Sequence, residues 1–383
     1  MKKILIIYVL LFYLTGCWNY RELNDYAIVT GMAIDYADNK YEVSLLFSSS
    51  KKTDKDQDSI ITLYSDTGDS IYEAIKKISL SIPKEIYISH LSTVIISDTL
   101  ARNGVTPVLD YLLREPQSHQ NFFIILSKDS KAKDILSVIA PMADYPSQNI
   151  TSTIKITEQL QGRITNANFN KFISRIIQKG ISPISNSIVL IGNKDSGTKK
   201  EEQENSITSA QTKLDTIGIF KGDKLIDWAN IEESIGINML VGDVKVLYFD
   251  LPCNNNKTII TTNKYKINNK VEKNKIVVEI TAKGMINEVG CNIDLQDNKV
   301  ITKLQEEAKD KMKEYAYKAI SKAKLLKTDI FGYGNMIYKK YPEYFNNIED
   351  WNEYFPNLDI IVNIDFKLEE KGALEQTIGE LKK

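Results

Sequence analysis

A long amphipathic segment near the C-terminus limits the folds that are open to this chain. From about Asp297, apolar residues recur at helical spacing, with lysine and glutamate on the opposite face. A helix of this length rises about 45 Å, so its apolar stripe must lie against a sheet or other helices. The final segment supplies a strand in which apolar and mainly polar residues alternate; its apolar members are Leu358, Ile360, Val362, Ile364, Phe366 and Leu368. We therefore predict a C-terminal α+β unit, residues 256–383, built from a sheet and one long helix.

The first half of the chain alternates between strand-like and helix-like segments. Helices are predicted to begin at Ser70, which can cap with Glu73, and at Thr106, which precedes Pro107. A further helix is predicted near Phe169 to Gln178. The strand-like segments are rich in β-branched and aromatic residues, and they are Tyr26 to Ile34, Tyr41 to Phe47, Ile60 to Tyr64, His90 to Ile96 and Asn121 to Ser127. We predict a mixed α/β domain over residues 17–192, with apolar strands covered on both faces.

The middle of the chain divides into a polar stretch and a compact unit. Residues 193–211 carry many charges and almost no aliphatic side chains, which indicates a flexible linker or a long loop. Beyond it, Ile217 to Lys221 and Lys224 to Trp228 flank Gly222-Asp223 as a hairpin, and Asn230 can cap a helix. We predict a small central α+β domain over residues 212–255. The fold class is thus α+β or mixed α/β, with three unlike domains that each pack helices on a mixed or antiparallel sheet.

The N-terminus has the layout of an export signal. Lys2 and Lys3 precede the apolar run from Ile4 to Leu14, which rises only about 16 Å as a helix and cannot cross a 30 Å hydrocarbon core. Leu14-Thr15-Gly16-Cys17 then resembles a bacterial lipobox. We predict a signal peptide, residues 1–16, that is removed, and a Cys17 that carries diacylglyceryl and N-acyl chains. Because each buried CH₂ contributes about 0.8 kcal/mol, two or three chains would hold the body on the outer face of the membrane.

Composition argues against several classes of function. The chain has 49 Lys and Arg against 50 Asp and Glu, so we expect no binding to nucleic acid. With only two histidines, His90 and His119, and no recognisable catalytic or nucleotide motif, we expect no catalysis, no metal and no cofactor. Gly332-Tyr333-Gly334 follows a helix rather than a strand, which favours a helix break over a nucleotide loop. Cys253 and Cys291 could form a disulfide or remain two thiols, and the sequence leaves both open.

Several blocks spread along the chain form a recognisable pattern, and they are Gly16 to Asn24, Ala27 to Asp35, Leu109 to Gln117, Gly218 to Leu225, Glu232 to Gly236, Asp329 to Gly334 and Tyr341-Pro342. These blocks resemble the C subunit lipoproteins of spore germinant receptors, the Ger(x)C family, although Asn19 replaces an acidic residue. The resemblance implies three mixed α/β domains, a place on the outer surface of the spore inner membrane, assembly with integral membrane A and B subunits, and no catalysis.

Charged residues within these blocks are our candidates for contacts with partners. They are Arg21, Glu22, Arg114, Glu115, Glu232 and Glu233, and each could instead serve an ion pair or a helix cap within the chain. An alternative function is a substrate-binding lipoprotein that delivers a nutrient to a membrane transporter. Two similar lobes with a hinge between them would favour this alternative. A membrane-tethered hydrolase would need paired carboxylates in a cleft or a metal site, and the sequence indicates neither.

Overall fold

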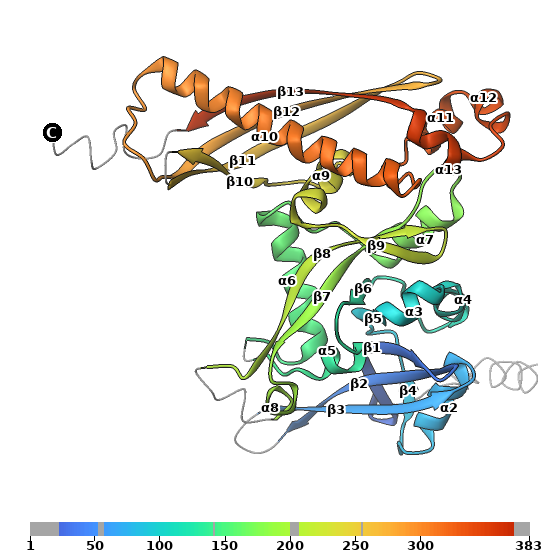
Figure 1. Ribbon diagram of the computed structural model, residues 1–383. Helices are drawn as coiled ribbons and strands as arrows, with labels where there is room; N and C mark the ends of the chain where they lie inside the picture. The colour runs from blue at the N-terminus through green and yellow to red at the C-terminus, as the bar shows by residue number, and fades with distance from the viewer. Residues whose placement is uncertain (1–22, 53–56, 141, 200–206, 254–255, 371–383) are drawn as a thin grey trace, which may run out of the picture.

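The structure is a computed structural model that describes residues 23–52, 57–140, 142–199, 207–253 and 256–370. Two sheets organise it, and they lie toward opposite ends of the molecule in Figure 1. The predicted α+β class, with one long C-terminal helix, is confirmed.

The first sheet has nine strands, in the order β3-β2-β1-β5-β6-β7-β8-β9 with β4 beside β1. Strands β1, β5, β6 and β7 run parallel in the centre, and the hairpins at both sides are antiparallel. The strands are β1 (Tyr26–Ala37), β2 (Lys40–Lys52), β3 (Gln57–Gly68), β4 (Glu85–Tyr87), β5 (Thr93–Ser97), β6 (Phe123–Ser127), β7 (Ile184–Gly192), β8 (Ala210–Lys221) and β9 (Lys224–Trp228).

Helices cover both faces of this sheet because its central strands are apolar on both faces. On one face, Met32 and Val94 pack in a core with helices α2 (Ile71–Ser79), α3 (Asp98–Asn103), α4 (Thr106–Arg114) and α7 (Phe169–Ile177). On the other face, Ala33 and Ile95 pack with α5 (Ala132–Ser137) and α6 (Pro146–Leu160). Strand β1 has a β-bulge at Gly31, since the β1–β2 register shifts between Val29 and Gly31.

The second sheet has four strands in the order β10-β11-β12-β13, and the long helix α10 (Asn298–Leu325) lies along it (Figure 1). Its strands are β10 (Tyr248–Cys253), β11 (Asn256–Val271), β12 (Lys275–Val289) and β13 (Asp359–Glu370), the last parallel to β12. Asp297 caps α10, whose Leu304, Ala308 and Met312 are buried. Short helices close one end of the sheet: α11 (Tyr333–Lys340), α12 (Pro342–Asn346), α13 (Trp351–Tyr354) and the 3-10 turn η3 (Phe355–Asn357).

The predicted central unit, residues 212–255, has no sheet of its own among the described residues. Strands β8 and β9 extend the first sheet through β7, whereas β10 belongs to the second sheet. Helix α9 (Ile231–Val241), between them, packs against α10. The hairpin and the Asn230 cap were predicted correctly. Local sequence patterns identify a strand, but they do not show which other strand it pairs with. The predicted linker holds a short helix, α8 (Lys194–Gly197), and residues 200–206 lie outside those described.

A single apolar core joins the two sheets. Ile217 and Ile219 of β8 belong to the same cluster as Ile235 of α9 and Met312 of α10. The backbones of α9 and α10 approach closely at Gly236, where an added Cβ would overlap the carbonyl oxygen of Tyr315. The buried Arg175 of α7 adds a polar link, because its guanidinium donates to the carbonyl oxygens of Ser182 at 3.1 Å and Ile330 at 2.8 Å.

Two local features differ from the sequence-based prediction. Helices α5 and α6 were not predicted. His90 lies in a turn before β5 and is exposed beside the ring of Tyr87. The question left open for the cysteines is settled, because Cys253 and Cys291 form a disulfide with their Cα atoms 5.9 Å apart.

Candidate functional site

The candidate contact residues fall into three groups. Arg21 and Glu22 lie outside the described residues, as does Cys17, the predicted lipidation site. Arg114 and Glu115 lie at the C-terminal end of α4. Glu232 and Glu233 lie in the first turn of α9. The structure therefore does not gather the four described residues at one place.

Both glutamates of α9 make contacts within the chain. Glu233 completes a capping box, in which its amide donates to Asn230 Oδ1 at 2.8 Å and the Asn230 amide donates to Glu233 Oε2 at 2.8 Å. Glu232 accepts from Lys318 and, at 3.2 Å, from Lys311, both on α10. The hydrogen bonds from Lys318 and Lys311 lower the pKa of Glu232. Glu233 thus caps the first turn of α9, and Glu232 ties α9 to α10.

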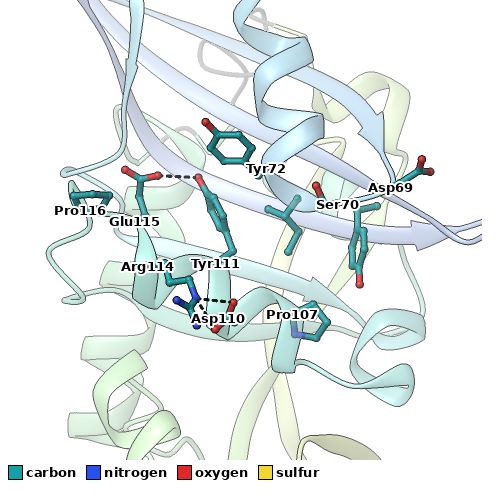
Figure 2. Close-up of a pocket in the computed structure, with 11 residues that line it drawn as sticks. Asp69, Ser70, Tyr72, Pro107, Asp110, Tyr111, Arg114, Glu115 and Pro116 are labelled. Carbon is teal, nitrogen blue, oxygen red and sulfur yellow. Dashed lines mark hydrogen bonds and ion pairs between the residues drawn. The ribbon is translucent and has the colours of Figure 1, made fainter.

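Arg114 and Glu115 line a surface groove between α2 and α4, which we call the α2–α4 groove. Its volume is about 550 Å³, and Figure 2 shows the side chains around it. Tyr41 comes from β2, and the remaining residues come from the beginning of α2 and from α4 with its C-terminal end. These are Asp69, Ser70, Ile71, Tyr72, Pro107, Asp110, Tyr111, Arg114, Glu115 and Pro116.

Local capping fixes the two helices that form the groove. Ser70 Oγ accepts from the Glu73 amide at 3.2 Å, and Glu73 Oε2 accepts from the Asp69 amide at 2.8 Å, so the first turn of α2 is capped. Val105, at the N-cap of α4, provides no side-chain cap. Instead, Asp223 in the β8–β9 turn accepts from the Thr106 hydroxyl at 2.6 Å and its amide at 3.3 Å. The β8–β9 hairpin therefore positions α4.

The polar side chains of the groove form two pairs along α4. Arg114 Nε donates to both carboxylate oxygens of Asp110, at 2.9 and 3.0 Å. The Tyr111 hydroxyl donates to Glu115 Oε2 at 3.4 Å. Burial, followed by the charge of Glu115, raises the pKa of Tyr111, so its hydroxyl remains a neutral donor. Sequence reasoning found Arg114 and Glu115 but missed Tyr41, Asp69 and Tyr72, which come from distant segments.

A second constellation lies around Asp329, at the turn before α11. Its buried carboxylate accepts from the amides of Gly332 at 2.8 Å and Gly334 at 2.7 Å and from Trp351 Nε1 at 3.1 Å, and further contacts come from the amides of Phe331 and Tyr333. Burial raises the pKa of Asp329 to about 6, although these hydrogen bonds act in the opposite direction. The chain's own carboxylate therefore occupies the amides of the glycine-containing turn, which agrees with its interpretation as a helix break.

Two further findings concern the described part of the chain alone. Within it, no group of three or more His, Cys, Asp and Glu side chains is arranged to hold a metal ion. No helix there combines the length and the apolar character needed to cross a bilayer.

The fold defines a class of protein: an α+β body with two sheets joined by one core and a surface groove on the first sheet's side. Residues 19–190 match the family model described as "Spore germination protein N-terminal domain", and residues 215–372 match "Spore germination B3/ GerAC like, C-terminal". The chain belongs to this family of spore germination proteins, and the resemblance to the Ger(x)C family is confirmed.

Relatives match over nearly their whole length. The chain is 26% identical to "Spore germination protein KC" of Bacillus subtilis, over 95% of this chain and 94% of that protein. It is 27% identical to "Putative spore germination protein YfkR" of the same organism, over 96% and 95% of the two chains. The crystal structure of the GerBC protein aligns with a TM-score of 0.52 and 18% identity, covering 88% of this chain and 97% of that one. That likeness concerns the fold alone.

Proposed function

We propose that this chain is a non-enzymatic, lipid-anchored subunit of a spore germinant receptor, held on the outer face of the spore inner membrane and assembled with integral membrane A and B subunits. The supporting observation is the match of both family models, in order, over residues 19–190 and 215–372. Relatives named as spore germination proteins, including "Spore germination protein B3" at 22% identity, share its length. Nutrient-triggered germination is the process in which we place it.

The anchor would work by confinement. Acyl chains on Cys17 would keep the body close to the membrane and raise its effective concentration at partner loops to roughly the millimolar range. Contacts that are weak individually would then suffice for assembly. A small interface, such as one along the α2–α4 groove, is compatible with this requirement.

The six candidate contact residues contribute unequally to this proposal. Arg21 and Glu22 follow Cys17 directly in the sequence and would be close to the membrane. Arg114 and Glu115 remain our best described candidates, because the Arg114 side chain is 78% exposed and both residues line a groove. Glu232 and Glu233 would have to exchange their present contacts with Lys311 and Asn230 before meeting a partner.

Nutrient delivery to a transporter receives less support. Such lipoproteins would have two similar lobes with a ligand between them. The two sheets here are unlike, with nine and four strands, and they share one core.

Germination of engineered spores tests the proposal. The gene is deleted in a strain that lacks paralogous receptors, and loss of spore refractility is followed on a panel of nutrients. We expect the deletion to abolish the response to at least one nutrient. Wild type and Asn19→Ala should restore it, whereas Cys17→Ala should restore little or none. Normal germination of the deletion strain on every nutrient to which its parent responds would refute the proposal.

A further inference from the structure

The α2–α4 groove carries an excess of negative charge. Its charged residues are Asp69, Asp110, Glu115 and Arg114, and the only cation among them is already bound by Asp110 at 2.9 Å. Asp69 is 80% exposed, with Lys40 Nζ at 4.0 Å. Glu115 accepts long hydrogen bonds from neutral donors, the Tyr111 hydroxyl and the Gln117 amide, both at 3.4 Å. Asp69 and Glu115 can therefore each form a shorter ion pair with an added cation.

The walls of the groove suit an aliphatic stem that ends in an ammonium group. Tyr41, Tyr72 and Tyr111 supply aromatic surface, while Pro107 and Pro116 add apolar surface. Tyrosine faces attract cations, and Lys76 Nζ already lies 5.1 Å from the centroid of the Tyr72 ring. In Figure 2, Glu115 and Asp69 mark opposite ends of the groove. A segment lying along it would thus meet a carboxylate at either end.

Of the two helix ends at the groove, the C-terminal end of α4 favours a cation. Glu115 and Pro116 follow the last turn of α4, where carbonyl groups give the helix end a partial negative charge. The partial positive charge at the beginning of α2 is offset within the chain, because Ser70 Oγ accepts from the Glu73 amide and the Glu73 carboxylate lies in the first turn. The electrostatic preference of the groove is therefore for a positive group.

The groove and the beginning of the described chain lie at opposite ends of strand β1. Tyr41 of the groove is opposite Tyr36, near the end of β1, whereas Tyr26, at its beginning, is opposite Glu85 of β4. Cys17 lies six positions before Leu23, and a chain of that length spans at most about 20 Å. The membrane location of the partner therefore rests on the proposed tether and not on the distance between the groove and Leu23.

We propose that the α2–α4 groove binds a short, lysine-bearing segment of a partner protein at the membrane. The lysine ammonium lies against Glu115 or Asp69, and its methylene stem packs along Tyr72 and Tyr111. A volume of about 550 Å³ accommodates a few side chains of an extended segment. The location of the partner rests on the proposed function, whereas the preference for lysine rests on the groove.

Zero-length cross-linking tests this contact in spore inner membranes that contain the full chain. A carbodiimide activates a carboxylate, a lysine amine in contact displaces the urea, and an amide bond forms with the oxygen leaving in the urea. Mass spectrometry of the linked peptides then identifies both residues. We expect Glu115 or Asp69 to be joined to a lysine of another protein. Linkage only to lysines of this chain such as Lys40, linkage to an amino lipid, or no linkage at all would overturn the proposal.

Matched variants separate the groove from general surface charge. The double variant Asp69→Asn and Glu115→Gln removes two charges while preserving shape, and the control Glu353→Gln alters an exposed glutamate of α13. We expect the double variant to lose the cross-link to the partner and to slow germination about tenfold, while the control keeps both at wild-type levels. An unchanged melting temperature verifies folding, and Glu115→Gln alone replaces the double variant if that variant melts early.

The outcomes also distinguish this proposal from the proposed function. If deletion of the gene abolishes germination but the double variant germinates at the wild-type rate, the groove proposal is wrong and the receptor role stands. If the deletion strain germinates normally although Glu115 cross-links to a lysine of another protein, the groove proposal stands and the receptor role falls.

Discussion

At the scale of single residues, Asp329 fixes the beginning of α11 and its contact with α13. One carboxylate accepts from the amides that follow it and from the indole of Trp351. Gly334 is required there for packing, because an added Cβ would overlap the Trp351 ring. The Asp329 to Gly334 block is therefore explained by structure, with no need for a bound nucleotide.

We expect Asp329→Ala to lower the free energy of unfolding by about 3 kcal/mol, since it leaves several buried donors without an acceptor. The matched control is Asp350→Ala, which removes an exposed cap that accepts from the Asn352 amide. That change should cost only about 1 kcal/mol. Urea unfolding of both variants measures the difference, and equal losses would contradict the role assigned to Asp329.

Gly236 sets how closely α9 and α10 approach. Gly236→Ala should destabilise the protein by about 3 kcal/mol, because the new Cβ meets the Tyr315 carbonyl. Gly222→Ala is the control: Gly222 has φ of 62° but nothing within 4 Å of an added Cβ, so its cost should be near 1 kcal/mol. Thermal unfolding ranks the two variants, and a Gly236→Ala protein that is as stable as Gly222→Ala would show that the helices can separate.

At the scale of helices and strands, local signals predicted what depends on neighbouring residues. The β8–β9 hairpin, the Asn230 capping box and the beginning of α10 all follow from residues a few positions apart. Pairing between strands depends on distant residues instead. Leu214 lies opposite Ile188 across the predicted linker, so the strand at the beginning of the presumed central unit completes the first sheet. No periodicity within residues 212–255 contains that information.

The Cys253–Cys291 disulfide joins the end of β10 to the segment after β12, across 38 residues of sequence. Replacing both cysteines by alanine should lower the free energy of unfolding by about 2–4 kcal/mol, because the reduced unfolded chain regains the entropy of an open loop. The measurement is thermal unfolding with and without a reductant. Equal melting temperatures, with two free thiols found by mass spectrometry, would contradict the disulfide.

At the scale of the whole molecule, the candidate site could be predicted only in part. Arg114 and Glu115 were found because they follow one another in a family-like block, whereas Tyr41 reaches the groove from strand β2 and Asp69 from the turn before α2. Similarly, Glu232 was recognised as a charged residue near a cap. Its partners Lys311 and Lys318 lie 79 and 86 residues further along the chain, beyond the reach of local patterns.

The proposed receptor role depends on acyl chains that hold the body at the membrane beside its partners. The most direct measurement is mass spectrometry of the N-terminal peptide of this protein, purified from the spore inner membrane. We predict a chain that begins at Cys17 and carries a diacylglyceryl thioether and an N-acyl group. A chain that retains Met1 and its leader, or that is recovered from the soluble fraction with an unmodified Cys17, would contradict the account.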